Sequence, residues 1–502
     1  MQNFDVLVIG GGATGLGCAV EAASRGYKTL LLEAHDYGKG ASSKSTKLVH
    51  GGIRYLANFD FALVQEGLEE RHYFLKNAPH LAEAQTYLIP FHNLFEKIQY
   101  HIGIHLYDFL AKKLKIGRSR FLSKQETLAE APDMNPRHIV GGGIYYDGQF
   151  DDARMLITLL KTFESFGGAA LNYHPVTGFI EEAGRITGVQ VVGGEKFYAK
   201  AIINATGTLT DQLLTLAEPN KTHDNVTAAQ GTHLVFDQAV FQCRHALVIP
   251  KTVDGRILFV LPWHQHLVVG TTDVKMDQPT LEPAAQEAEI DLILNTFNQY
   301  LTQAVTRKDI RALFVGQRPL VKPAHAQNTK KISRKHEIFE TANGLISIVG
   351  GKWTIYRRMG QDTIDFAIQK GRLPSSKPSV TQNLALFGAT DHPEAYPLNV
   401  YGTEAAMIRQ IQEETQNKAL LHPRLPYFQA EVFYHLRHEH AKTVEDILAR
   451  RTRAIFLDVE AALEAAPWVA ETLAQYFGHN QEWVRAQIAS FQAFAAHFKH
   501  ST

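Results

Sequence analysis

The sequence predicts an α/β protein with a discontinuous, Rossmann-like dinucleotide-binding domain, an antiparallel-sheet second domain and an all-helical C-terminal region. The chain opens with an apolar strand pattern that runs into a glycine-rich turn. A similar combination of strand and small-residue turn returns at 201–207 and at 344–354. Residues 395–502 contain alanine-rich amphipathic segments, which are typical of packed helices.

The first element is a buried parallel strand followed by a phosphate-binding turn. Residues 6–9 form an apolar run with β-branched residues, and Gly10, Gly12 and Gly15 have the G-x-G-x-x-G spacing. The first glycine permits the tight turn, the second lets backbone approach a pyrophosphate, and the third lets the helix pack on the strand. The helix N-terminus, with its free amides and positive dipole end, favours the phosphates.

The second strand, 29–32, ends in Glu33, where an acid can bind a ribose 2′-hydroxyl. A carboxylate at this position disfavours NADP as the ligand, and it does not distinguish NAD from FAD. The loop at 40–52 then combines serines, a threonine and glycines, which offer donors without bulk to a second part of the ligand. Arg54 and Tyr55 follow directly, and 59–78 has a helical apolar pattern.

The residue pattern at 98–124 predicts a basic amphipathic surface. Its first half mixes aromatic and aliphatic residues, and its second half is rich in lysine and arginine. Such a segment suits an anionic lipid surface, while a solvated charged face over a core helix is the alternative. The basic residues are Lys112, Lys113, Lys115, Arg118, Arg120 and Lys124.

The return of the nucleotide-binding pattern at 201–207 and 344–354 predicts that the first domain is discontinuous. Between these stretches, 228–340 is rich in strand patterns that favour an antiparallel sheet. The predicted dinucleotide-binding domain comprises 1–75, 145–227 and 341–372, the substrate domain comprises 76–144 and 228–340, and the helical cap comprises 395–502.

The composition is that of an ordinary globular protein, with 45% hydrophobic and 20% charged residues and a formal net charge of +0. The protein therefore has no net positive charge that would favour binding to nucleic acid. The two cysteines form no CxxC motif, which favours a reducing, cytoplasmic setting. We expect no membrane-spanning segment, so any membrane contact would be peripheral.

Four cationic side chains and one histidine stand beside glycine turns or strand ends. Converging cations would bind a dianion such as a phosphate, although a single arginine is more often a surface or ion-pair residue. His233 could act as a general base or could be structural. No HExxH or GxSxG pattern is present, and no metal site is expected. The cationic residues are Arg54, Arg318, Arg334 and Lys352.

These residues lie in motifs that closely resemble those of the flavin-linked glycerol-3-phosphate dehydrogenases. The resemblance spans about the first three quarters of the chain and continues more weakly through Ala449-Arg450-Arg451-Thr452-Arg453. The combination of KLVHGGIRYL and GGKWTIYR is its most specific part. The matching stretches are VLVIGGGATGLG, SSKSTKLVHGGIRYL, YYDGQFDDAR, INATG, GTHLV, GTTD, GQRPL and IVGGKWTIYRRM.

The resemblance implies FAD, with the second domain built on an antiparallel sheet of the amino-acid-oxidase type. It places sn-glycerol 3-phosphate beside Arg54, Tyr55 and Arg334, with His233, Arg318 and Lys352 as catalytic residues. The implied FAD contacts are Gly10, Gly12, Ala13, Thr14, Gly15, Glu33, Ser42, Ser43, Lys47, Leu48, Gly51, Gly52, Ala205, Thr206, Gly207, Gly351, Lys352, Trp353 and Thr354.

The implied reaction is oxidation to dihydroxyacetone phosphate, with hydride passing from C2 to flavin N5. His233 is the first choice for the base, with Arg318 or Lys352 stabilising the developing alkoxide. Electrons would pass to a membrane quinone at the inner face of the cell membrane. The alternatives are an oxidase that reduces O2 to H2O2, an FAD amine or amino-acid oxidase, and a flavin-binding interaction module without catalysis. The sequence does not decide whether the protein forms a homodimer.

Overall fold

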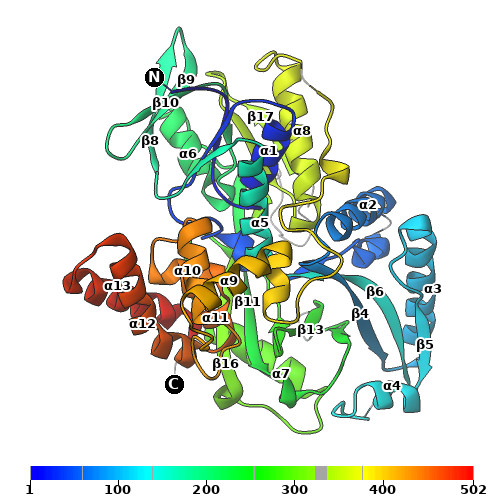
Figure 1. The fold of residues 1–502 in the computed structure, drawn as a ribbon. Coiled ribbons are helices and arrows are strands. Elements are labelled where there is room, and N and C mark those ends of the chain that lie inside the picture. The colour runs from blue at the N-terminus through cyan, green and yellow to red at the C-terminus, as the bar shows by residue number, and fades with distance from the viewer. Residues whose placement is uncertain are drawn as a thin grey trace.

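The computed structural model describes residues 2–58, 60–137, 139–252, 255–322, 336–375 and 377–500. Two sheets organise these residues, one above the other in Figure 1. The eight strands of the first sheet are β1 (Gln2–Ile9), β2 (Thr29–Leu32), β7 (Ala169–Leu171), β8 (Val176–Glu182), β9 (Arg185–Val191), β10 (Lys196–Asn204), β17 (His336–Glu340) and β18 (Ile346–Gly350).

The first sheet has the predicted α/β character. Its main order is β17-β18-β10-β1-β2-β7, and β18, β10, β1, β2 and β7 run parallel. β17 and the β8–β9 hairpin are antiparallel additions. Because β1, β2 and β10 are central neighbours, the turn after β1 lies where the carboxyl ends of three strands meet.

The apolar run in β1 is explained by burial on both faces of the sheet. Val6 and Val8 pack into one cluster with α1, α5 and α8. Leu7 and Ile9 pack into a second cluster with residues of β9, β10 and α6. A strand covered on both faces needs apolar residues at every position rather than at alternate ones.

The second sheet has ten strands and is mainly antiparallel, with the order β15-β11-β14-β13-β12-β4-β6-β3. β16 pairs along the full length of β11, and β5 pairs with β6. The strands are β3 (Leu48–Val49), β4 (Ala82–Phe91), β5 (Arg120–Ser123), β6 (Gly141–Phe150), β11 (Val226–Asp237), β12 (Ala246–Ile249), β13 (Leu258–Trp263), β14 (His266–Gly270), β15 (Val274–Met276) and β16 (Ile310–Val321).

Helices cover both sheets, and the C-terminal helices form a group beside β11 and β16 (Figure 1). α3 lies at the opposite side of the second sheet, next to β5 and β6. The helices are α1 (Ala13–Ser24), α2 (Phe61–Asn77), α3 (Leu94–Ala111), α4 (Lys124–Glu130), α5 (Asp152–Ser165), α6 (Thr210–Ala217), α7 (Glu287–Asn298), α8 (Tyr356–Gln369), α9 (Ala405–Glu414), α10 (Gln429–His438), α11 (Ala454–Leu457), α12 (Val459–Phe477) and α13 (Gln481–Ala495).

The two faces of the second sheet belong to different cores. On β11, Val235 joins the cluster that contains the apolar residues of α11 and α12. Its neighbours Leu234 and Phe236 join the cluster under α7. The C-terminal helices therefore share a continuous core with the sheet.

Several strands do not follow the predicted domain boundaries. β6 begins before residue 145 and belongs to the ten-stranded sheet, whereas β17 lies within 228–340 and belongs to the eight-stranded sheet. The division into three domains stays a prediction. Among the described helices, none combines the length and apolarity needed to cross a bilayer.

Helices α1 and α8 approach so closely that only glycine fits at their contact. A Cβ on Gly360 would lie 2.4 Å from the carbonyl oxygen of Gly17. We expect Gly360→Ala to lower the free energy of unfolding by about 1–3 kcal/mol through overpacking. Thermal unfolding should show a lower melting temperature.

The matched control is Gly103→Ala in α3, where a Cβ meets nothing within 4 Å. This change should raise stability by about 0.5–1 kcal/mol, because alanine loses less backbone entropy in a helix. Equal melting temperatures for the two variants would contradict the proposed α1–α8 packing constraint.

Candidate active site

The turn between β1 and α1 is shaped by close backbone approaches. Gly10 has a φ of +112°, and a Cβ there would lie 2.6 Å from the Ala205 carbonyl oxygen. A Cβ on Gly15 would lie 1.8 Å from the Gly10 carbonyl oxygen. These contacts require glycine at both positions and bring the start of α1 against the strand ends.

Glu33 lies beside this turn. Its carboxylate accepts hydrogen bonds from the backbone amides of Gly11 (2.6 Å) and His35 (2.9 Å). Burial raises the pKa of the carboxyl, and the two amides oppose that effect. The side chain is thereby fixed at the end of β2, on the wall of the main cavity.

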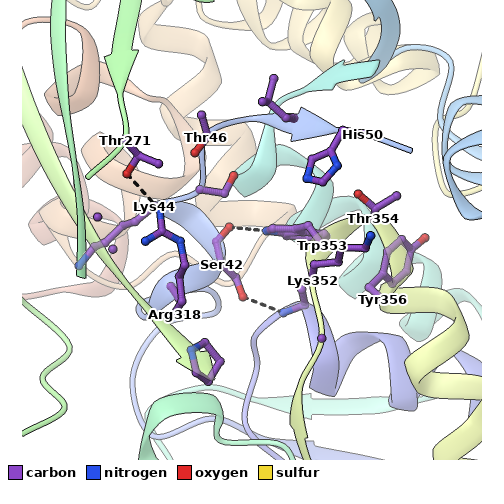
Figure 2. Close-up of a pocket in the computed structure, with 18 of the residues that line it drawn as sticks. Ser42, Lys44, Thr46, His50, Thr271, Arg318, Lys352, Trp353, Thr354 and Tyr356 are labelled. Carbon is purple, nitrogen blue, oxygen red and sulfur yellow. Dashed lines mark hydrogen bonds between the residues drawn. The ribbon is translucent and has the colours of Figure 1, made fainter. Parts of the chain in front are cut away.

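Ser42 joins the two glycine-rich turns. Its hydroxyl accepts a hydrogen bond from the Ala13 amide (3.0 Å), and its carbonyl accepts one from Trp353 Nε1 (2.8 Å). Figure 2 shows Ser42 between the Lys352–Thr354 turn on one side and Arg318 on the other. One short loop therefore connects the first turn of α1 to the turn after β18.

A cavity of about 1010 Å³ follows these elements and continues between the two sheets. This volume is at the upper end of the 300–1,000 Å³ typical of ligand pockets, which suits a long ligand with a second molecule beside it. The predicted residues that line it are Gly10, Gly12, Ala13, Thr14, Glu33, Ser42, Leu48, Gly52, Ala205, Thr206, Gly207, His233, Arg318, Gly351, Lys352, Trp353 and Thr354.

Other predicted residues lie just behind the cavity wall. Gly15 packs in the helix, and the Gly51 amide donates to Asp147 Oδ1 (3.0 Å). Ser43 donates its hydroxyl to the Gly38 carbonyl (2.7 Å). The Tyr55 ring centroid lies 5.0 Å from Lys352 Nζ.

Two predicted substrate residues cannot be placed in the cavity. The structure gives the backbone of Arg54 within the 3₁₀ helix η2 (Ile53–Asn58), while its side chain lies outside the described part of the chain. Arg334 lies in 323–335, which is also outside the described residues. Their roles stay predictions.

Lys47 is buried behind the cavity rather than on its lining. Its ammonium donates to Asp152 Oδ2 (2.6 Å) and to the carbonyls of Ser43 (3.3 Å) and Ser45 (3.0 Å). Burial lowers its pKa to about 8, against the opposing effect of Asp152. A contact between this ammonium and the cofactor would need a different arrangement of the loop.

His233 lies on β11, with only 1% of its surface exposed. Its Nε2 is 3.0 Å from Thr46 Oγ1, and its ring stacks on Phe314 with a centroid distance of 4.5 Å. Burial, followed by the positive charges of Lys47 and Arg318, places its pKa well below 6.5. The imidazole is therefore neutral near pH 7, as a proton acceptor must be.

Arg318 projects from β16 and is positioned by the turn after β14. Its Nη2 donates to Thr271 Oγ1 (3.0 Å), its Nη1 donates to the Thr272 carbonyl (3.3 Å), and Asp273 lies 3.6 Å away. A Cβ on Gly231 would lie 2.5 Å from Arg318 Nη2. The guanidinium thus occupies space that only a glycine on the neighbouring strand leaves open.

Sequence reasoning assigned no role to Thr46 or Thr271, although both line the cavity and contact predicted site residues. Thr46 lies in the SSKSTK stretch and Thr271 in the GTTD stretch. The hydroxyl residues within these two motifs were therefore the sequence feature that could have identified them. The described residues contain no cluster of three or more metal-ligating side chains.

The donor set fits a dinucleotide. The Gly12 position lacks a side chain where a Cβ would lie 3.0 Å from Ser42 Oγ, so the backbone at the helix start stays accessible. The helix N-terminus can receive the pyrophosphate, and Glu33 can accept from a ribose hydroxyl. On the same cavity wall, Arg318 and Lys352 offer positive charge beside neutral His233.

Comparisons with known proteins agree with this arrangement. Residues 5–357 match the family described as FAD dependent oxidoreductase, and residues 346–484 match the C-terminal domain of alpha-glycerophosphate oxidase. The chain is 36% identical to a probable mitochondrial glycerol-3-phosphate dehydrogenase of Caenorhabditis elegans, over 98% of this chain and 73% of that protein. It is 37% identical to the mitochondrial glycerol-3-phosphate dehydrogenase of Bos taurus, over 96% of this chain and 71% of that protein.

Among solved structures, the glycerol-3-phosphate dehydrogenase of Bacillus halodurans complexed with FAD has a TM-score of 0.80 and 26% identity, covering 99% of this chain and 95% of that one. The glycine oxidase of Geobacillus kaustophilus has a TM-score of 0.56 at 16% identity, covering 78% of this chain and 100% of that one, and shows a shared fold alone. The expectations of FAD and of this fold class are confirmed.

We expect Gly12→Val to weaken FAD binding, because the added side chain meets Ser42 and narrows the approach to the helix start. Overpacking of about 1–3 kcal/mol corresponds to a loss of about 5- to 150-fold in affinity. The ratio of flavin absorbance to protein absorbance in the purified protein measures the effect. Gly178→Val on β8 is the control, since a Cβ there meets nothing within 4 Å; equal flavin content in both variants would contradict the assignment.

Proposed function

The chain belongs to the FAD-dependent glycerol-3-phosphate dehydrogenases, and we propose that it oxidises sn-glycerol 3-phosphate at C2 and delivers the electrons to a membrane quinone. The observation that carries this proposal is the cavity itself. It joins the dinucleotide turn, the neutral His233 and the cations Arg318 and Lys352 in one continuous space.

The phosphate of the substrate requires fixed positive charge. Arg318 is held on two sides by Thr271 and Thr272, so its guanidinium is oriented before substrate arrives. Pre-oriented guanidinium groups bind phosphate through charge-assisted, two-point hydrogen bonds. Lys352 supplies a second cation on the cavity wall, and Arg54 and Arg334 are proposed to complete the set.

Loss of the C2 hydroxyl proton requires a base. His233 serves this role because burial and two nearby cations keep its imidazole neutral. Arg318 or Lys352, which both line the cavity, stabilises the negative charge that develops on the C2 oxygen as the proton leaves. When bound, FAD supplies the acceptor for the hydride that leaves C2. The product is dihydroxyacetone phosphate.

The quinone assignment is supported by the apolar part of the cavity wall. This part consists of aromatic and aliphatic side chains from β4, β6, β12 and α3 and from Ile257 and Phe259. Such a lining suits a hydrophobic electron acceptor better than a water-soluble one. Its residues include Tyr87, Ile89, Ile104, Leu106, Tyr145, Val248, Ile257 and Phe259.

Peripheral attachment to the inner face of the cell membrane is supported by the outer face of α3. Exposed large apolar side chains follow this helix, and Ile102 among them also lines the cavity. The basic residues at 112–124 are exposed next to it, where they can meet anionic headgroups. The exposed apolar residues are Leu94 (70%), Phe95 (76%), Ile98 (53%), Ile102 (64%) and Phe109 (70%).

We expect His233→Gln to lower kcat for glycerol 3-phosphate by about 10²–10⁴-fold, since the amide can hydrogen-bond to Thr46 but accepts no proton. Anaerobic flavin bleaching by substrate measures the reductive step directly. In the unchanged enzyme, kcat at saturating substrate should stay constant as the pH falls from about 8 to 6, because His233 titrates well below 6.5.

His266→Gln on the neighbouring strand β14 is the matched control, because His266 is partly buried and does not line the cavity. Its kcat should remain close to that of the unchanged enzyme. If His233→Gln kept the kcat of the unchanged enzyme, His233 would be excluded as the base. If an amino acid bleached the flavin and glycerol 3-phosphate did not, glycerol 3-phosphate would be excluded as the substrate.

The double variant Phe95→Glu/Ile98→Glu should weaken binding to anionic phospholipid vesicles by about tenfold or more, since each buried apolar side chain contributes about 1.5–3 kcal/mol. Quinone reduction in vesicles should fall in parallel, whereas reduction of a water-soluble dye should not change. Vesicle cosedimentation and the two acceptor assays measure these effects.

Val192→Glu provides the control, because Val192 is 62% exposed and directly follows β9, a strand that lies far from α3 in Figure 1. Unchanged vesicle binding in the double variant would contradict the membrane surface on α3. Rapid H2O2 release in the absence of quinone would instead favour the oxidase reaction.

A further inference from the structure

The C-terminal helical region places three buried arginines against the loop that follows β2. They stand at the end of a π-helical turn, η11 (Asp446–Arg451), in which the Thr452 amide donates to the Ile447 carbonyl five residues earlier (2.8 Å). π-Helical turns are rare and are often found at functional sites. The three residues are Arg450, Arg451 and Arg453, each at most 3% exposed.

The first attachment point is Asp36, which is fully buried three residues after Glu33. Arg451 binds both carboxylate oxygens of Asp36 at 2.8 Å, and Arg450 Nε donates to Oδ2 at 2.5 Å. These charge-assisted bonds lower the pKa of Asp36 and keep it ionised. The start of the loop is therefore fixed by side chains from the far end of the chain.

The second attachment point is the other end of the same loop. Arg453 Nη2 donates to the Ser43 carbonyl (2.6 Å) and lies 3.3 Å from Asp152 Oδ1. Asp152 in turn accepts from the amide and hydroxyl of Ser45 (3.0 and 2.7 Å) and from Lys47 Nζ (2.6 Å). Residues 43–47 are thereby fixed through Arg453 and its carboxylate partner.

The segment between these two points lines the cavity next to the first turn of α1. His35, Lys39 and Ser42 are among its cavity-lining residues, and Ser42 binds the Ala13 amide. Apart from the single turn η1 (Ala41–Ser43), the segment has no helix or strand to define its backbone. Outside contacts must hold such a loop in one conformation, because its chain entropy favours many.

We propose that the C-terminal helical region controls FAD affinity by holding this cofactor loop at both ends, with Arg450, Arg451 and Arg453 as positioning residues. The inference concerns cofactor binding and is independent of the substrate and the electron acceptor. By reciprocity, FAD bound in the cavity stabilises the docking of η11 by the same free energy with which η11 favours FAD.

The test is FAD titration into full-length apoprotein, followed by quenching of flavin fluorescence. Asp36→Asn keeps the side-chain size but loses the carboxylate, and Arg453→Lys keeps the charge but loses the fork of donors. We expect each dissociation constant for FAD to rise by about 5- to 150-fold, the usual range of coupling between sites. The visible circular dichroism of bound flavin should also change.

Arg424→Met is the matched control, since Arg424 pairs with Asp458 and Glu464 within the C-terminal region. Leu473→Ala, at a buried position of α12, controls for loss of stability alone. Both should bind FAD within about twofold of the unchanged protein. Unaltered FAD affinity in folded Asp36→Asn and Arg453→Lys would overturn the proposal.

Hydrogen exchange on the unchanged protein provides a second test that needs no variant. The reciprocal coupling predicts slower exchange of the amides at 446–453 when FAD is added to the apoprotein. If FAD leaves exchange in this segment unaltered, the proposal is wrong, whatever the activity toward glycerol 3-phosphate.

Discussion

The close approach of backbone to backbone at the β1–α1 turn is the constraint on which the rest of the structure depends. Gly15 lies so near the Gly10 carbonyl that no side chain fits, and α1 is therefore pressed against the ends of the parallel strands. On its other side, α1 meets α8 through Gly17 and Gly360. This packing brings the amides of the helix start to the cavity wall and places Glu33 and Ser42 beside them. The FAD site is thus a consequence of how the first sheet is covered.

The two sheets contribute different groups to the wall of the cavity. The first sheet contributes acceptors and backbone donors for the dinucleotide, while β11 and β16 of the second contribute His233 and Arg318. The charges are mutually dependent, because Arg318 and the buried Lys47 help to keep His233 neutral. Lys47 is itself balanced by Asp152. A neutral histidine and fixed cations can coexist in one small space because burial and like charge both disfavour protonation of the imidazole.

The C-terminal region is part of this arrangement rather than an attached module. Its apolar residues share a core with the second sheet, and its arginines neutralise Asp36 and bind the Ser43 carbonyl. Ion pairs this deeply buried are costly to desolvate, and their net contribution to stability is small. Their directional bonds define the conformation of a loop that lacks regular structure. A role in shaping the cofactor site accounts for their presence better than stability alone.

The sequence by itself determined the α/β class, the phosphate-binding turn and Glu33, because spacing and alternation are local properties of the chain. FAD followed from the sequence only through the resemblance of longer motifs to those of a known family. Most of the site residues that the sequence predicted line the cavity. Tertiary structure alone decided that Lys47 turns toward Asp152, that Tyr55 lies beneath Lys352, and that Arg451 reaches Asp36. These contacts depend on which distant group lies beside a buried or partly buried charge in the folded chain. Local patterns contain no information on such pairing, so only the folded chain could settle it.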